Sequence, residues 1–151
     1  MHSVFVSGMV RMGFKEKDIK HIESNVGLSY ALYDEGSWQN ELKNGDMTRA
    51  PEALNLVRHQ VADSSISKIE IDSFYGKLKD RNLTVVHNEK VLHPMQPYLF
   101  EPMKNQIDFF LKTFNIDQSI VATNQVWHWK EFFTLIALVC SFLLILSLIH
   151  I

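Results

Sequence analysis

The chain has 151 residues and a net charge of −2, with 46% hydrophobic and 21% charged side chains. This composition is typical of a globular protein with some additional apolar sequence, and it excludes a disordered or low-complexity chain. Because basic and acidic residues are balanced and mixed along the sequence, no nucleic-acid partner is predicted. The only cysteine, Cys140, excludes an intrachain disulfide and a cysteine-based metal site.

Candidate helices and strands alternate through the first two thirds of the chain. Residues 15–23 are polar with Ile19 and Ile22 at helical spacing, and residues 28–33 form an apolar run that predicts a buried strand. Pro51 suits the first turn of a helix, since its missing N–H would have no partner there. The apolar positions that define one face of this helix are Ala53, Leu54, Val57 and Val61.

The next segments predict two further strands and a second helix. Residues 67–71 and 83–87 are the candidate strands, with turn residues between them. Prolines make the following stretch irregular. A helix is predicted over residues 99–114, and its apolar face comprises Phe100, Met103, Ile107, Phe110, Leu111 and Phe114. The alternation indicates an α/β fold with a small, incomplete sheet, whose outer strands need partners.

A single membrane-spanning helix is predicted at the C-terminal end. Residues 132–149 contain no charged side chain, and a helix of that length covers about 27 Å, close to the hydrocarbon thickness of a bilayer. Trp127 and Trp129 precede this run, where indole rings favour the membrane interface. We therefore predict two domains, residues 1–126 and residues 127–151, and a single-pass membrane location. A longer parent chain could contain further spans.

Asp34 and His93 are the candidate catalytic residues because each follows a predicted strand. The carboxyl ends of strands form the edge of an open α/β sheet where sites occur. A carboxylate at this edge can orient a histidine, which can then act as a general base on a hydroxyl nucleophile. An aspartate after a strand can equally be a turn residue, and a His-Pro pair can be a simple loop.

Four short motifs resemble the C-terminal part of an α/β-hydrolase domain from bacterial multi-pass membrane proteins. They are NVGLSYALYDE at residues 25–35, FYG at 74–76, VLHP at 91–94 and QIDFF at 106–110. The likeness covers most of residues 25–146. It implies that Asp34 is the acid of a catalytic triad, that His93 is its histidine, and that the substrate contains an ester or related acyl bond.

The sequence departs from this resemblance in two respects. No G-x-S-x-G motif occurs, so the serine nucleophile would belong to a missing N-terminal half or a partner subunit, and the isolated chain is expected to be an inactive fragment or a degenerate member. Asp34 and His93 are also 59 positions apart, which implies an inserted helix near residues 53–61. Asp72 and Asp63 are the alternative acids, and His87 is the alternative histidine.

The remaining expectations concern ligands and a non-enzymatic alternative. The seven histidines have no H-x-x-x-H or H-x-x-E-H spacing, so we expect no metal and no other cofactor. The expected partners are the lipid bilayer and an acyl or ester substrate. The alternative is a membrane-anchored structural or interaction module, in which Phe100, Phe110 and Phe114 present an apolar face to a partner subunit.

Overall fold

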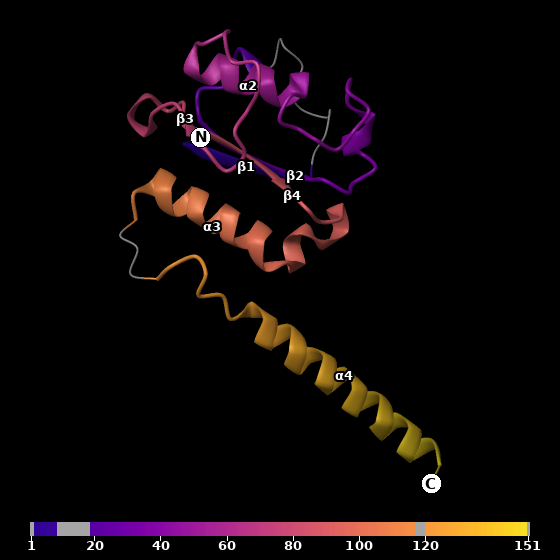
Figure 1. Ribbon diagram of the computed structural model, residues 1–151. Helices are drawn as coiled ribbons and strands as arrows, with labels where there is room; N and C mark the ends of the chain where they lie inside the picture. Colours follow the sequence, from indigo (N-terminus) through magenta and orange to yellow (C-terminus); the bar gives the residue numbers. More distant parts are fainter. Residues whose placement is uncertain (1, 9–18, 117–119, 151) are drawn as a thin grey trace. The chain divides into compact units, whose positions relative to one another are not determined.

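The structure, a computed structural model, describes residues 2–8, 19–116 and 120–150. It divides the chain into two compact units, Met1–Ser119 and Ile120–Ile151. The first unit is a small α/β sheet with flanking helices, and the second contains one long apolar helix (Figure 1). The predicted α/β class and the predicted C-terminal apolar helix are thereby confirmed.

The sheet has four strands in the order β1-β2-β4-β3. Strands β1 (Ser3–Ser7), β2 (Asn25–Ala31) and β4 (Thr84–Glu89) run parallel to their neighbours, whereas the two-residue strand β3 (Phe74–Tyr75) pairs with β4 in the antiparallel direction. Because the three longer strands are parallel, their carboxyl ends meet at one edge of the sheet. The segments that follow β2 and β4 are therefore brought together.

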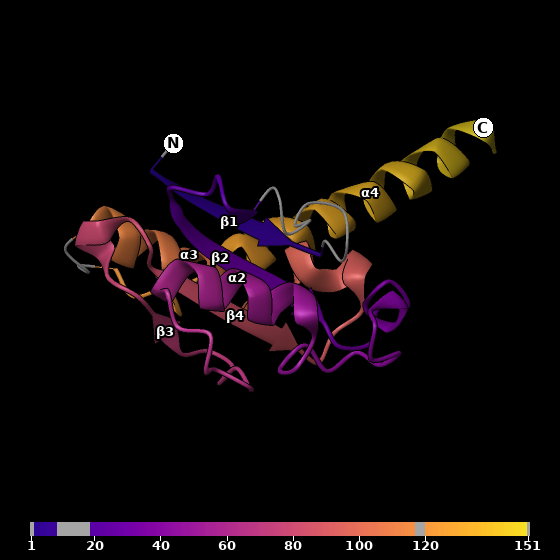
Figure 2. The ribbon, with the colours of Figure 1, turned by 90° about the horizontal axis from the view of Figure 1, so that it is seen from above.

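Helices cover both faces of this sheet. Helix α2 (Pro51–Val61) lies on one face and helix α3 (Phe100–Phe114) on the other (Figures 1 and 2). The helices predicted over these two segments are confirmed, and Pro51 occupies the first turn of α2 as expected. Three short 3-10 helices lie in the loops: η1 (Ser37–Gln39), η2 (Leu78–Asp80) and η3 (His93–Tyr98).

The main hydrophobic core lies between the sheet and α2. Alternate residues of β2, namely Val26, Leu28 and Tyr30, point to this face and are fully buried. They pack against the buried side chains of α2, which are Ala53, Leu54, Leu56 and Val57. The Tyr30 hydroxyl donates a 2.9 Å hydrogen bond to Glu52 Oε1, and burial, aided by this carboxylate, raises the pKa of Tyr30 well above its usual value.

The opposite face of the sheet packs against α3 through aromatic rings. The Phe5 ring of β1 lies 5.4 Å from that of Phe109. Gly27 of β2 permits this packing, since a Cβ there would lie 2.3 Å from Phe5 Cδ2. The prediction placed the wrong side of α3 against the sheet. Phe109, which was not assigned to the apolar face, is buried, whereas Phe100 and Phe114, which were, are exposed. The face toward the sheet also includes Pro102 and Thr113, so it is rotated from the most apolar stripe.

Two predictions about the remaining segments need correction, and one strand was missed. Strand β1 was not predicted, because Ser3–Ser7 is short and polar at both ends. Residues 67–71 form no strand; Ile69 is fully buried from a loop, and its N–H donates to the Thr48 carbonyl. The buried strand predicted over 28–33 is β2, which begins and ends earlier. Of the helix predicted over 15–23, residues 15–18 lie outside the described residues, residue 19 is helical, and residues 20–23 form a turn and irregular chain.

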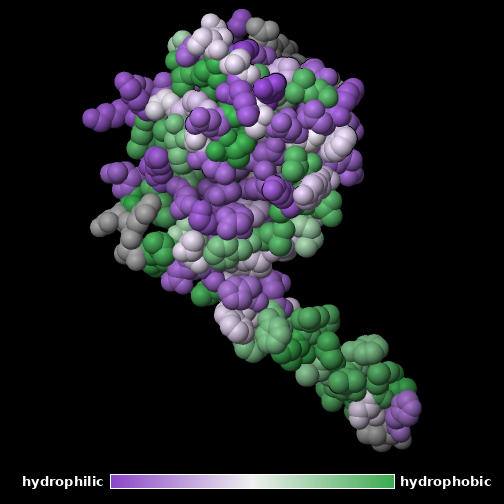
Figure 3. All heavy atoms as spheres, viewed as in Figure 1, coloured by the Kyte–Doolittle hydropathy of each residue, from purple (hydrophilic) through white to green (hydrophobic). Residues whose placement is uncertain are grey.

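The second unit consists mainly of helix α4 (Trp127–Ile149). This helix has 23 residues and is long and apolar enough to cross a membrane. None of its residues is buried in the structure. At 1.5 Å per residue it is about 35 Å long, which exceeds a typical hydrocarbon thickness of about 30 Å. Hydrophobic residues cover its visible face along most of its length (Figure 3). A polar stripe of the kind that a surface helix presents is absent from α4.

The packing of α3 predicts a sharp difference between two phenylalanines. We expect Phe109→Ala, at a fully buried position, to lower the free energy of unfolding by about 3–5 kcal/mol through lost contacts and a cavity. Phe114→Ala, at a position 52% exposed, should cost about 0.5–1.5 kcal/mol, mainly the ring contact with Phe110. Urea unfolding of the full chain in detergent micelles, followed by circular dichroism, measures both. Equal losses would contradict this description of the interface.

Candidate active site

The structure places Asp34 and His93 side by side at the carboxyl edge of the sheet. Asp34 lies three residues after β2, and His93 begins η3, four residues after β4. The Nδ1 atom of His93 is 2.9 Å from Asp34 Oδ2. The backbone also joins the two loops, because the Tyr33 N–H donates to the Val91 carbonyl at 3.2 Å. Parallel pairing of β2 with β4 thus brings together residues that are far apart in the sequence.

The carboxylate of Asp34 is held on both of its oxygens. Oδ1 accepts a 2.8 Å hydrogen bond from the Gly36 N–H, which forms a tight turn after the strand, and Oδ2 contacts His93. The Ser37 N–H donates to the Asp34 carbonyl and strengthens the turn. The Asp34 side chain is only 10% exposed. The aspartate is therefore both a turn residue and a fixed acceptor for the histidine.

The ring of His93 is oriented by this carboxylate and open on its other side. An ionised carboxylate can only accept, so the Nδ1 atom of His93 carries the proton and donates a hydrogen bond to Asp34. Nε2 is then the unprotonated nitrogen in the neutral ring, and it forms no hydrogen bond within the described part of the chain. The His93 side chain is 50% exposed. This is the arrangement that a general base requires.

The backbone of Gly8 lies close against the histidine ring. It follows β1 directly, has a φ of +72°, and donates its N–H to the Ser29 carbonyl at 2.9 Å. A Cβ at this position would lie 2.5 Å from Cε1 and 2.8 Å from Nδ1 of His93. Only glycine combines this backbone conformation with such a close approach. The carboxyl ends of β1, β2 and β4 therefore all contribute to the position of His93.

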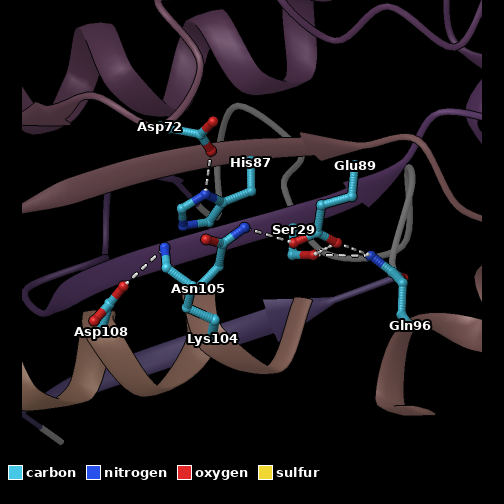
Figure 4. A network of polar contacts seen from close by, with 8 residues as sticks. All are labelled: Ser29, Asp72, His87, Glu89, Gln96, Lys104, Asn105 and Asp108. Atoms are coloured by element: carbon cyan, nitrogen blue, oxygen red, sulfur yellow. Dashed lines mark hydrogen bonds and ion pairs between the residues drawn. The ribbon is translucent and has the colours of Figure 1, made fainter. Parts of the chain in front are cut away.

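A buried polar network anchors the segment that carries His93. Gln96 of η3 donates through Nε2 to Ser29 Oγ at 2.8 Å and to Glu89 Oε2 at 3.0 Å (Figure 4). Ser29 Oγ donates to the same carboxylate oxygen at 2.7 Å, and Asn105 Nδ2 donates to Oε1 at 3.1 Å. Because Ser29, Glu89 and Gln96 are buried, this network connects β2, β4, η3 and α3 beneath the candidate site.

A second histidine–aspartate pair involves His87, which lies within β4 and not at the carboxyl edge of the sheet. His87 Nδ1 is 2.6 Å from Asp72 Oδ1, with the two side chains 5% and 65% exposed (Figure 4). In this pair the histidine is buried and the aspartate is exposed, which is the reverse of the first pair. His87 Nε2 is buried without a hydrogen-bond partner, and its ring lies 6.0 Å from that of Phe5. A reactant cannot reach this nitrogen without repacking of the sheet face.

The remaining alternatives from the sequence contribute no further member of the site. Asp63 accepts hydrogen bonds from the N–H and hydroxyl of Ser65, and these bonds lower the pKa of its carboxyl. No serine or threonine hydroxyl in residues 2–8, 19–116 and 120–150 donates to His93. Over the same ranges, no group of three or more histidine, cysteine, aspartate and glutamate residues could hold a metal ion.

Sequence reasoning identified the pair but missed the residues that position it. Gly8, Glu89 and Gln96 lie outside the four short motifs, and Ser29, although it lies within the first of them, was not singled out. Gly8, two residues after the apolar run Val4–Val6, was an available signal, because a glycine at the end of a strand often marks a close backbone approach. The buried hydrogen bonds of Glu89 depend on the register between β2 and β4, which no local pattern reveals.

Comparison of the chain with family models, curated proteins and solved structures finds no match.

Gly8 provides a direct test of how His93 is held. In Gly8→Ala the new methyl group should displace the imidazole, so that Nδ1 loses its bond to Asp34 and the ring becomes a mixture of tautomers. The ¹⁵N shifts of the His93 ring in micelles, assigned with a His93→Gln spectrum, report this change. Gly76→Ala is the matched control: its φ is +77° but it contacts Asn82, so it should destabilise the fold without altering His93. Unchanged His93 shifts in Gly8→Ala would contradict the assigned role.

Proposed function

We propose that the chain is the acid–histidine part of a membrane-anchored serine-type hydrolase that cleaves an ester or related acyl bond. The observation that supports this most is the 2.9 Å hydrogen bond between Asp34 and His93 at the carboxyl edge of parallel strands. The order of acid before histidine along the chain agrees with the α/β-hydrolase resemblance.

The proposed chemistry follows from the two ring nitrogens of His93. Nε2 takes the proton of a hydroxyl nucleophile as that oxygen attacks the acyl carbon, and it returns the proton to the leaving group. Asp34 keeps Nδ1 protonated throughout and stabilises the imidazolium that forms. General-base catalysis by a positioned histidine contributes about 10²- to 10⁴-fold to the rate. The buried, doubly bonded carboxylate of Asp34 is suited to this supporting role.

The nucleophile in this proposal comes from a segment of a longer parent chain or from a partner subunit. The described residues of this chain supply no hydroxyl to His93, and the sequence has no G-x-S-x-G turn. The chain by itself is then inactive toward esters. The sheet offers a place for the missing part, since β1 is at its edge and, among the described residues, pairs with β2 on one side only. A further parallel strand there would end at the same edge as Asp34 and His93.

Helix α4 is proposed to span the bilayer and anchor this domain. Its 23 unburied residues are apolar over nearly their whole length, and Trp127 and Trp129 lie at its N-terminal end. Indole side chains favour the interface between lipid and water. Hydrolysis would then take place close to a membrane surface, which suits a water-insoluble ester.

A second candidate function is a membrane-anchored interaction module without catalysis. The exposure of Phe100 and Phe114 on α3 favours it, because large exposed apolar side chains on one helix often mark a protein contact. In this case the Asp34–His93 pair would be a loop-stabilising hydrogen bond only. The two functions differ in whether the pair affects any covalent chemistry.

A serine-directed activity probe distinguishes the two functions. The tagged chain is captured from gently solubilised native membranes together with its associated proteins. A fluorophosphonate should then label either a longer parent chain or a partner subunit in the captured material. Because Asn cannot hold the histidine in the required tautomer, Asp34→Asn should lower the labelling rate by about 10⁴-fold, and His93→Ala should abolish labelling.

Two further variants are matched controls for this experiment. His59→Ala removes an exposed histidine of α2, and Asp72→Asn removes the acid of the second pair. Both should label as the wild type does. Absence of labelling in the captured wild-type material, or equal labelling in all five proteins, would refute the hydrolase proposal and favour the interaction module.

A further inference from the structure

Exposed apolar side chains are concentrated around the candidate site. Within the described part of the first unit, all the large exposed apolar residues except Phe114 and Ile116 lie in two segments, 33–42 and 92–100. These segments follow β2 and β4, and they are joined by the Asp34–His93 and Tyr33–Val91 hydrogen bonds. We use the name collar for the residues Tyr33, Trp38, Leu92, Met95 and Tyr98. Each of them is 44–60% exposed.

The three collar residues of the segment 92–98 are held outward by the same network that anchors His93. In η3, Gln96 is buried against Ser29 and Glu89, whereas residues 92–95 and residues 97 and 98 are exposed. The short helix is therefore fixed at its middle and presents Leu92, Met95 and Tyr98 to the outside. Ordered apolar side chains around a polar site usually mark a surface that contacts a membrane or another protein.

The covalent link to α4 favours a membrane as the occupant. Twelve residues, 115–126, connect α3 to α4, and they span about 40 Å at most when fully extended. A domain of this size is about 35 Å across by the usual scaling with chain length. Every face of the first unit can therefore reach the bilayer surface. Tethering over such distances gives an effective concentration of about 1 mM, so even a weak membrane contact is populated.

The chemistry of the collar also fits a bilayer interface. Tryptophan and tyrosine are the side chains enriched at the boundary between lipid and water, and leucine and methionine can enter the acyl region beside them. The exposed charges nearby include both signs, Glu35 and Lys90, so the surface shows no net preference for anionic lipid. A zwitterionic bilayer therefore satisfies the collar as well as an anionic one does.

We infer that the collar inserts into the interface of the bilayer that α4 spans, so that the Asp34–His93 site opens toward the lipid surface. This inference rests on the proposed insertion of α4. If the proposed hydrolase function also holds, the ester substrate is one that resides in the membrane and enters the site from the lipid. The collar itself binds lipid whether or not the site is catalytic.

Spin labels test the inference, because the chain has a single cysteine in α4. The full chain is reconstituted in phosphatidylcholine nanodiscs, one copy per disc. A nitroxide on native Cys140 first reports whether α4 is inserted, through high oxygen and low nickel-chelate accessibility. In a Cys140→Ala background, labels at Met95→Cys and Lys79→Cys then compare the collar with a control position. Lys79 is exposed in η2, which precedes the N-terminal end of β4, whereas the collar follows the carboxyl ends of the strands.

The expected result is a several-fold lower nickel-chelate accessibility at position 95 than at position 79, with oxygen accessibility maintained at 95. Adding Leu92→Ser and Tyr98→Ser should raise nickel-chelate accessibility at 95 to the value at 79. Phe114→Ser with Ile116→Ser, at two equally exposed apolar positions, should leave it low.

Three outcomes overturn the inference, and they are distinguishable. A label on Cys140 that is accessible to the nickel chelate shows that α4 is not inserted, which removes the premise. An inserted α4 with equal nickel-chelate accessibility at 95 and 79 refutes collar docking alone. Shielding of position 95 from both reagents shows that protein, either a second segment or a partner, covers the collar instead of lipid.

Discussion

The position of His93 depends on a buried carboxylate, Glu89, which has no salt bridge within the described part of the chain. Burying an ionised carboxylate costs several kcal/mol. Donors from Ser29, Gln96 and Asn105 offset this cost, because each hydrogen bond to a charged acceptor contributes about 1.5–3 kcal/mol. All three donors must be in place for the carboxylate to be satisfied. The network therefore selects one arrangement of η3 and α3 against the sheet.

This constraint explains why the loop after β4 is ordered although most of it is exposed. The prolines of η3 restrict the backbone, and Gln96 supplies the single buried anchor. His93 is three residues before that anchor and is held from two further sides, by Asp34 and by the backbone of Gly8. One ring nitrogen is thus fixed from within the fold and the other faces outward. A buried base such as His87 has the opposite arrangement and cannot meet a reactant.

The sequence allowed the prediction of elements whose signals are local. Helices α2, α3 and α4 have clear apolar periodicity or length, and the location of Asp34 and His93 followed from the convergence of parallel strands at one edge. Contacts that depend on pairing register could not be predicted. Ser29 and Glu89 are 60 positions apart and meet only because β2 pairs with β4. Residues 67–71 looked like a strand because Ile69 and Ile71 alternate with polar residues. Ile69 is buried, but it packs from a loop.

The free edge of the sheet and the exposed apolar residues beside it limit what this domain can do. Strand β1 pairs with β2 through one edge, and over the described residues its other edge retains backbone groups that a further strand could pair with. The carboxyl end of such a parallel strand would lie beside Gly8, whose backbone contacts the His93 ring. Asp34, His93 and a place for a further strand then coincide at one edge of the sheet, and the exposed apolar residues of the same edge determine the surroundings of that site.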